Sequence, residues 1–309
     1  MVSKIAKIPT NMDIKNGVGP SKVFIKNTEK AHTYLIDFLV EKFPQVPKEE
    51  WAKRMDQGLV LDEEGIPQST SDQCRVNAFI YYYRSIEIEE SIPFQELIVY
   101  EDEHLLIADK PHFLPVTPAG HYLQETLLVR LKNKTSIKDL TPIHRIDRET
   151  AGLVAFSKKT QDRNLYQVLF RERQIKKTYE AIAPYQEHLK DQFPIQRMSR
   201  IEESDIFIQM QEVSGEPNSD TVIQLLEVSK PWARYQLELG TGKKHQLRVH
   251  MNALGMPIKY DKIYPNIIAQ PKMGKDFSEP LQLLAKQLSF KDPVTQLEHE
   301  FRSSFVLSL

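Results

Sequence analysis

One short run of the chain concentrates charged side chains of both signs. Residues 143–153 read Ile-His-Arg-Ile-Asp-Arg-Glu-Thr-Ala-Gly-Leu and follow a proline. Asp147 stands two residues after Arg145 and directly before Arg148, and nearby positive charge favours the ionised form of a carboxyl group. Asp147 is therefore a candidate nucleophile or base rather than a general acid. A structural ion pair in a turn is the alternative interpretation.

A second candidate segment, residues 239–251, leaves an expected strand through a glycine turn and opens an expected helix. Exposed N–H groups and the helix dipole favour an anion at such a start. Lys244 and Arg248 are four residues apart and would share a helical face, with His245 near the same side. His245 and His250 would stand about 140° apart around a helix, so we predict no metal site. A basic, solvated helix start is the alternative.

A third segment places an aromatic ring beside basic side chains, with Lys176, Lys177 and Tyr179 on one expected strand. Such a ring can stack on a nucleobase whose phosphate the lysines neutralise, although a core tyrosine is the alternative. More broadly, residues 130–179 hold 13 Lys and Arg against 5 Asp and Glu. Clustered positive charge suits a phosphate backbone, whereas acids folded in from distant sequence would leave an ordinary solvated surface.

The composition of the whole chain limits what these segments can do. Its 309 residues, 40% hydrophobic and 27% charged, fit about two folded domains. The net charge of −1 provides no global attraction to nucleic acid, so any nucleic-acid partner must be met by a local patch. A single cysteine, Cys74, and an opening segment without the apolar core of a secretion signal predict a cytoplasmic protein. No apolar run is long enough to span a membrane.

The elements that must position these segments fall into two parts. In residues 1–92 we expect a small unit with helices over 34–40 and 51–55 and a strand at 59–61. Residues 93–309 form the second part, which opens with a β-hairpin over 96–100 and 104–108. Further strands are expected at 153–156, 179–183, 222–226 and 235–239, and helices at 161–171 and 243–254. This order predicts an α+β domain with a mixed, largely antiparallel sheet flanked by helices.

Together, these segments resemble the RluA-type family of RNA pseudouridine synthases, whose signature loop is His-Arg-Leu-Asp-Arg-x-Thr-Ser/Ala-Gly-Leu, here with Ile146 for the leucine. The other matches keep the family's order between residues 95 and 295: Asp109-Lys110-Pro111, Lys177 to Ala181, Thr241 to His250, Gly255 to Ile258 with Asp261, and Leu283-Leu284-Ala285 with Leu288-Ser289-Phe290. The departures from the family pattern are Lys243, Lys244, Tyr260 and Leu284, which stand where arginine, threonine, glycine and often histidine are usual. They concern substrate fit more than chemistry.

The resemblance implies a pseudouridine-synthase-type fold with a small N-terminal helical unit, and an enzyme that needs no cofactor and no metal. It implies that Asp147 is the essential catalytic residue, that Tyr179 contacts the target base and that Arg248 pairs with Asp147. Arg145 matches a residue that helps fill the space left by the flipped base. The residues expected to contact RNA are His144, Arg145, Arg148, Lys177, Lys243, Lys244 and His245.

Pseudouridine formation breaks the bond from uracil N1 to the sugar and joins C5 in its place. A carboxylate near the sugar can attack C1′ or remove a proton from C2′, and the sequence leaves both routes open. We expect a monomer that acts on structured RNA, with ribosomal RNA favoured over transfer RNA. The amino-terminal unit faintly resembles a small helical RNA-binding module, and a packing extension is the alternative.

Two other functions stay open at this point. One is a catalytically silent RNA-binding assembly factor of the same fold, which the basic middle of the chain and the departures would suit. The other is a carboxylate-dependent hydrolase built on Asp147 and Asp261, for which no second acid stands in a comparable motif.

Overall fold

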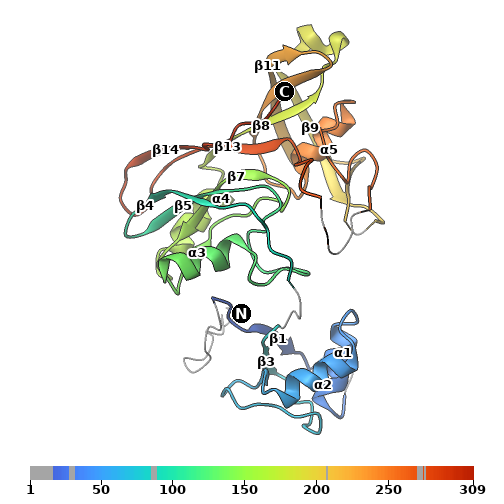
Figure 1. The fold of residues 1–309 in the computed structure, drawn as a ribbon, viewed down its shortest axis with the longest axis vertical. Coiled ribbons are helices and arrows are strands. Elements are labelled where there is room, and N and C mark those ends of the chain that lie inside the picture. The colour runs from blue at the N-terminus through green and yellow to red at the C-terminus, as the bar shows by residue number, and fades with distance from the viewer. Residues whose placement is uncertain (1–16, 28–31, 85–88, 207, 270–273, 275) are drawn as a thin grey trace. The chain divides into compact units, whose positions relative to one another are not determined.

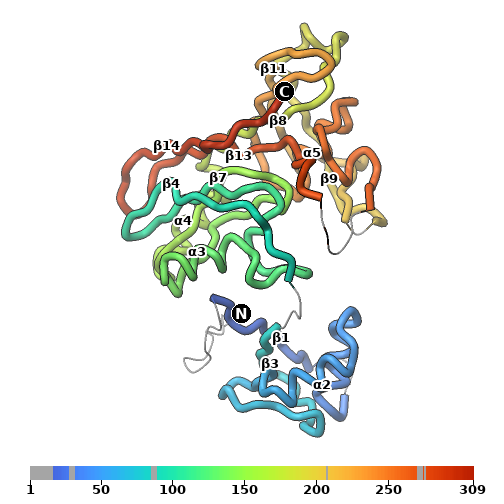
Figure 2. The backbone as a smooth tube through the Cα atoms, in the orientation of Figure 1, coloured from blue at the N-terminus to red at the C-terminus, as the bar shows by residue number. Residues whose placement is uncertain are grey.

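The computed structural model describes residues 17–27, 32–84, 89–206, 208–269, 274 and 276–309; Figure 1 shows the ribbon and Figure 2 the path of the backbone. The chain divides into two compact units, Met1–Glu89 with Gly120–Gln124 and Glu90–Ala119 with Glu125–Leu309. The opening segment that argued against secretion lies outside the described residues. Within the described ranges, no helix is long and apolar enough to cross a membrane.

The first unit contains the two expected helices and also a small sheet. Its helices are α1 (Leu35–Lys42) and α2 (Lys48–Asp56), and its strands are β1 (Ser21–Ile25), β2 (Val60–Leu61) and β3 (Ala78–Tyr82). The strands pair antiparallel in the order β1-β3-β2. Val23 and Ile80 on one face of this sheet pack with Phe38 and Trp51 of the helices. The unit is therefore part helix and part sheet, rather than helical alone.

A large sheet forms the frame of the second unit. Its strands are β4 (Leu97–Glu101), β5 (Leu105–Lys110), β6 (Thr141–Pro142), β7 (Ala151–Ser157), β8 (Lys176–Pro184), β9 (Ile195–Glu203), β10 (Met210–Val213), β11 (Ser219–Ser229), β12 (Trp232–Leu239), β13 (Leu283–Lys291) and β14 (Glu298–Arg302). They follow the order β10-β9-β11-β12-β8-β13-β7-β5-β4, with β14 beside β13 and β6 beside β7. Among the described strands, only β7 and β13 pair in parallel. The predicted mixed, largely antiparallel sheet is confirmed.

The helices of this unit are α3 (Leu127–Thr135), α4 (Arg163–Arg171) and α5 (Gln246–Ala253), with a 3₁₀ turn at Glu187–Gln192. Helix α4 confirms the expectation for 161–171, whereas α5 begins three residues later than the expected helix at 243–254. Helix α3 was not predicted. Thr126 is its N-cap, and the Thr126 hydroxyl accepts the Val129 N–H at 3.4 Å and so caps the first turn.

Helices α4 and α5 pack on the same face of the sheet. Leu169 of α4 lies in one core cluster with Leu288 of β13, and Met251 of α5 lies in another with Ala285 of the same strand. Ala285 and Leu288 are an odd number of residues apart, so in a regular strand they would face opposite sides. A bulge between Ala285 and Gln287 shifts the alternation and turns both toward the helices.

Gly152 allows the parallel pairing of β7 with β13. Its φ is +110°, and a Cβ atom there would lie 2.3 Å from the carbonyl oxygen of Ala285 and 2.7 Å from its nitrogen. Any side chain would therefore collide with the backbone of β13. Because Gly152 directly follows the charged loop around Asp147, this close approach fixes where that loop enters the sheet.

Candidate active site

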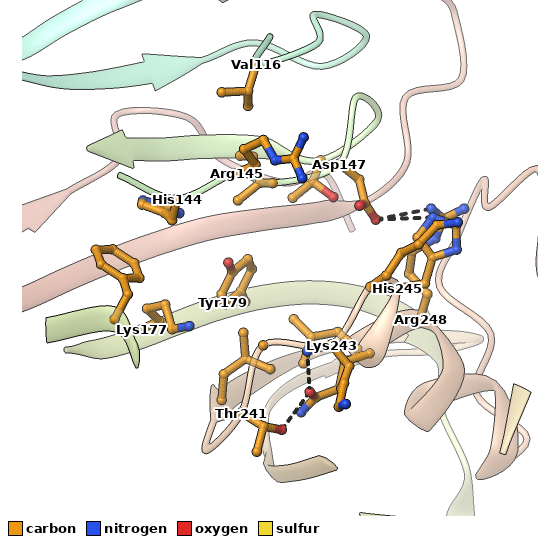
Figure 3. Close-up of a pocket in the computed structure, with 18 of the residues that line it drawn as sticks. Val116, His144, Arg145, Asp147, Lys177, Tyr179, Thr241, Lys243, His245 and Arg248 are labelled. Atoms are coloured by element: carbon orange, nitrogen blue, oxygen red, sulfur yellow. Dashed lines mark hydrogen bonds and ion pairs between the residues drawn. The ribbon is translucent and has the colours of Figure 1, made fainter. Parts of the chain in front are cut away.

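A pocket of about 860 Å³ opens on the helix-bearing face of the sheet (Figure 3). The charged loop, the end of α4, strand β8 and the turn before α5 all contribute to its lining. The basic residues of the lining are Arg145, Arg148, Arg171, Arg173, Lys177, Lys243, Lys244 and Arg248. Among the described lining residues, Asp147 is the single acid. The chain as a whole is almost neutral, yet this pocket gathers positive charge around one carboxylate.

Asp147 and Arg248 meet in this pocket although 101 residues separate them in sequence. The Arg248 Nη1 donates to Asp147 Oδ2 at 3.3 Å, as Figure 3 shows. The Arg248 side chain is only 2% exposed, whereas that of Asp147 is 31% exposed. Asp147 is thus partly exposed at the cavity, while the side chain of Arg248 is buried.

Sequence reasoning missed the main partner of Arg248, which is Asp261. Arg248 Nε donates to Asp261 Oδ2 at 2.7 Å and Nη2 donates to Oδ1 at 2.6 Å, a bidentate pair with both side chains buried. Burial alone would lower the pKa of Arg248, but the hydrogen bonds and charge of Asp261 raise it above its usual value. Asp261 is enclosed by these contacts, so it is not placed to act as a second acid of a hydrolase. The signal that could have revealed this pair was Asp261 itself, an acid within the matched segments that had no assigned cation.

His245 reaches Asp147 from a second direction. The residue is the N-cap of α5, with a left-handed backbone at φ 56°, and its Nε2 lies 3.8 Å from Asp147 Oδ2. Its Nδ1 lies 3.1 Å from the hydroxyl of Tyr264. Burial lowers the pKa of His245, although the nearby charge of Asp147 partly opposes that shift.

The start of α5 differs from the prediction in two respects. Because the helix begins at Gln246, Lys244 lies in the preceding turn and does not share a helical face with Arg248. The Gln246 side chain closes that turn by accepting from the Lys243 N–H at 3.0 Å and from the Thr241 hydroxyl at 2.7 Å, as Figure 3 shows. The ring nitrogens of His250 form hydrogen bonds with the hydroxyls of Thr221, Ser219 and Ser199, so His250 does not face His245.

Tyr179 forms part of the pocket wall and part of the core. It is 8% exposed, belongs to the core cluster under α5 and also lines the cavity. Burial, with the neighbouring charge of Asp147, raises the pKa of Tyr179 well above its usual value, so the hydroxyl is protonated at neutral pH. Tyr179 therefore lies both in the hydrophobic core and in the wall of the pocket.

Lys177 and His144 both contact the ring of Phe170 at the end of α4. Lys177 Nζ lies 5.7 Å from the Phe170 ring centre, and the His144 ring stacks on Phe170 at 4.5 Å. Burial lowers the pKa of His144 to about 3, with a smaller contribution from the charge of Lys177. Its Nε2 accepts the Ala155 N–H at 3.2 Å. His144 is therefore neutral, and it cannot bind RNA phosphate as a cation at neutral pH.

The charged loop is anchored from below by Lys110. This lysine is fully buried, and its Nζ donates to the carbonyls of Pro111 at 2.9 Å, Leu114 at 2.7 Å and Arg148 at 3.0 Å. Burial lowers the pKa of Lys110 to about 7. On the other side of the loop, Arg148 pairs with Glu149 at 2.9 Å and 3.0 Å. The backbone that carries Asp147 is thus held at the very next residue.

The basic stretch at 130–179 separates into two groups. Arg130 pairs with Glu96 and Glu125, Lys158 with Glu101 at 2.8 Å and Lys159 with Glu103, all away from the pocket. For these side chains the ordinary explanation, acids folded in from distant sequence, holds. The structure adds two pocket residues that the predicted site lacked, Arg171 and Arg173, at the end of α4.

Comparisons with known proteins bear on the class of this enzyme. A profile of the family described as RNA pseudouridylate synthase matches residues 104–253. The dual-specificity RNA pseudouridine synthase RluA of Pasteurella multocida is 32% identical over 216 residues, covering 64% of this chain and 88% of the relative. The ribosomal large subunit pseudouridine synthase C of Vibrio cholerae is 28% identical over 221 residues, covering 71% and 69%.

A solved structure, the human RNA pseudouridylate synthase domain containing 1, shares the fold with a TM-score of 0.56. It is 21% identical and covers 71% of this chain and 88% of its own. Fold, motifs and relatives together define the class as RNA pseudouridine synthase, an enzyme that acts on RNA. More narrowly, the chain belongs to the RluA-type pseudouridine synthase family.

Proposed function

We propose that this enzyme converts uridines of ribosomal RNA to pseudouridine, with Asp147 as the group that acts on the sugar. The observation that carries the role of Asp147 is its place as the one acid among the basic residues of the described pocket. Arg248 holds one oxygen of this carboxylate, and the side chain remains 31% exposed toward the cavity. The pocket volume of about 860 Å³ is ample for one nucleotide.

The reaction needs a carboxylate and no group donor. The bond from uracil N1 to C1′ breaks, C5 bonds to C1′ in its place, C5 loses its proton and N1 gains one. Asp147 either attacks C1′ or takes a proton from C2′, and in both routes the free uracil turns within the pocket before it is joined again. All atoms of the substrate are retained in the product, so the residues of the pocket suffice.

Tyr179 provides an aromatic wall for the turning uracil. Its ring lines the cavity, and its charge-neutral hydroxyl adds no negative charge beside Asp147. A target uridine must leave its stack to reach this site, at a cost of a few kcal/mol. Basic side chains at the mouth can offset that cost by contacting the flanking phosphates. Arg145 lines the pocket, is exposed and has no ion-pair partner among the described residues. Its side chain is therefore available to fill the space left by the flipped base.

The substrate assignment is the finer part of the proposal. The Vibrio relative is named for the large ribosomal subunit, which supports ribosomal RNA as the first substrate to test. The Pasteurella relative is named for dual specificity, which supports testing a second class of RNA beside it. We assign residues 1–92 to a separate amino-terminal unit that aids RNA binding and residues 93–309 to catalysis. We expect a monomer acting in the cytoplasm, in keeping with a single cysteine.

The test is to incubate the purified protein with ribosomal and transfer RNA and to map pseudouridine at single-nucleotide resolution. We expect product in ribosomal RNA with wild type and with the surface control Asp191→Asn, and at least about a 1,000-fold lower rate with Asp147→Asn. Full activity of Asp147→Asn would remove Asp147 from its role. Wild-type protein that binds RNA but modifies none of it would instead support the silent assembly factor.

A further inference from the structure

The two basic partners of Asp147 meet the same oxygen of its carboxylate. Arg248 Nη1 lies 3.3 Å from Oδ2, and His245 Nε2 lies 3.8 Å from that atom. Among the described residues, Oδ1 has no hydrogen-bond partner. Both basic groups therefore approach one oxygen of the carboxylate, and the other oxygen is left for a different partner.

The second nitrogen of His245 connects this carboxylate to a tyrosine outside the pocket lining. Tyr264 is 5% exposed, and its hydroxyl accepts the Met210 N–H at 2.8 Å. The single hydroxyl proton of Tyr264 has two possible acceptors, the Met210 carbonyl at 3.2 Å and His245 Nδ1 at 3.1 Å. Which one it meets determines where the imidazole carries its own proton.

Electrostatics decides between these two arrangements. If Nδ1 carried the proton, the bare lone pair of Nε2 would face the Asp147 carboxylate, which is repulsive. If the Tyr264 hydroxyl donates to Nδ1, Nε2 carries the proton and points it at Oδ2. The negative charge of Asp147 therefore selects the second arrangement, a line of donors from Tyr264 through His245 to Asp147.

We propose that His245 is a positioning residue for Asp147 rather than an RNA contact: with Arg248 it anchors Oδ2, so that Oδ1 is the oxygen that meets the sugar. This inference rests on the proposed role of Asp147. The distance of 3.8 Å is too long for a hydrogen bond in the free protein. Such contacts often tighten only when substrate is bound, so we assign the closed hydrogen bond to the RNA complex.

The surroundings keep His245 a neutral donor. The charged groups that act on it are Asp147, Arg248, Lys244 and Asp261, two of each sign, and Tyr264 contacts it from the other side. Its side chain is 9% exposed, and burial lowers its pKa. A neutral imidazole orients the carboxylate without adding a full positive charge that would weaken its basicity.

Two amide side chains separate the two ends of His245. In His245→Asn the amide reaches the place of Nδ1 and can still meet Tyr264, but nothing reaches Asp147. In His245→Gln the amide nitrogen reaches the place of Nε2 and can still donate to Asp147. Because asparagine tolerates the left-handed backbone at φ 56° better than most residues, His245→Asn is not expected to unfold the turn.

The experiment measures single-turnover pseudouridine formation at saturating RNA, together with RNA affinity. We expect His245→Asn to slow the reaction about 10- to 100-fold with RNA affinity within about 3-fold of wild type. We expect His245→Gln to recover most of that loss, and the exposed control His188→Asn to match wild type. Nitrogen-15 shifts of the wild-type imidazole should show the Nε2–H tautomer.

Three results would overturn the inference: a wild-type rate for His245→Asn, a loss confined to RNA affinity, or equal losses for the asparagine and glutamine variants. Asp147→Asn is measured in the same series. If it is inactive while His245→Asn is fully active, the positioning role fails and the proposed function stands. If Asp147→Asn is fully active, the proposed function itself fails.

Discussion

Asp147 and Asp261 share Arg248, and replacing each with asparagine should lower stability by different amounts. Asp261→Asn removes the charge from a bidentate pair whose side chains are 0% and 2% exposed. Asp261 Oδ1 accepts the backbone N–H groups of Ile263 and Tyr264, so the asparagine oxygen would take that position. The asparagine NH₂ group would then take the position of Oδ2 and face the Nε–H of Arg248, donor against donor. Removing one partner of a buried ion pair costs about 3–5 kcal/mol. Since Arg248 keeps Asp147 as a second carboxylate, we expect the lower end, about 3 kcal/mol.

Asp147→Asn should behave differently, although it also removes a partner of Arg248. Arg248 keeps both hydrogen bonds to Asp261, and the lost contact is a single one of 3.3 Å to a partly exposed side chain. We expect a loss of at most about 1 kcal/mol of stability, with activity abolished. In the double variant Arg248 has no carboxylate, so the loss should exceed the sum of the two single losses.

Urea unfolding of the second unit, followed by circular dichroism, measures this contrast. With an m-value of about 3 kcal/mol/M, Asp261→Asn should lower the midpoint by about 1 M and Asp147→Asn by at most about 0.3 M. Asp191→Asn, on the surface, is the control. A midpoint for Asp261→Asn that equals wild type, or strictly additive losses in the double variant, would refute the assignment of Asp261 as the structural partner of Arg248.

Two further predictions concern the frame of the site. Gly152→Ala should cost more than about 3 kcal/mol, because its Cβ would lie 2.3 Å from the Ala285 oxygen at φ +110°. Gly255→Ala in the same unit, at φ +72° with only Gln186 Nε2 at 3.9 Å, should cost about 1 kcal/mol, and equal urea midpoints for the two would contradict this account. Burial lowers the pKa of fully buried His250 to about 4, below its value of about 6.5 in the unfolded chain, so the unfolded state binds more protons in acid. The contribution of neutral His250 to the free energy of unfolding is therefore complete above about pH 6.5 and is lost as the pH falls. At pH 5 we expect urea unfolding to give a free energy about 2 kcal/mol lower on account of this residue. In His250→Asn this part of the pH dependence should be absent.

Local patterns in the sequence were sufficient for most of the frame. The hairpin at 96–108, the strand before Ser157 and helix α4 are each defined by neighbouring residues, and the structure contains them. Helix α3 also had a local signal, the capping residue Thr126, but that stretch was interpreted for its charge alone. By contrast, the parallel pairing of β7 with β13 joins residues more than 130 positions apart. No local pattern encodes such a pairing.

The site shows the same division between local and distant information. The Asp147–Arg248 contact came from a resemblance, and the structure places the two side chains together. The resemblance did not predict that Asp261 pairs with Arg248, because a sequence motif shows which residues are present and not which side chains form ion pairs. His245 is among the residues expected to contact RNA, and the structure places its two ring nitrogens near Asp147 and Tyr264, two neighbours that the sequence did not predict for it.

Eight basic residues line the pocket around Asp147, and ion pairs with them could occupy both oxygens of its carboxylate. The contacts in the structure leave one oxygen of Asp147 without a partner among the described residues. Arg148, its neighbour in sequence, is engaged by Glu149, and Arg248 directs two of its hydrogen bonds to Asp261 and only one to Asp147. The His245 imidazole is kept neutral by burial. Asp147 is thereby oriented through one oxygen while the other remains available. Lys243 and Arg173 at the pocket are exposed and have no ion-pair partner among the described residues, so they can contact the phosphates of the RNA.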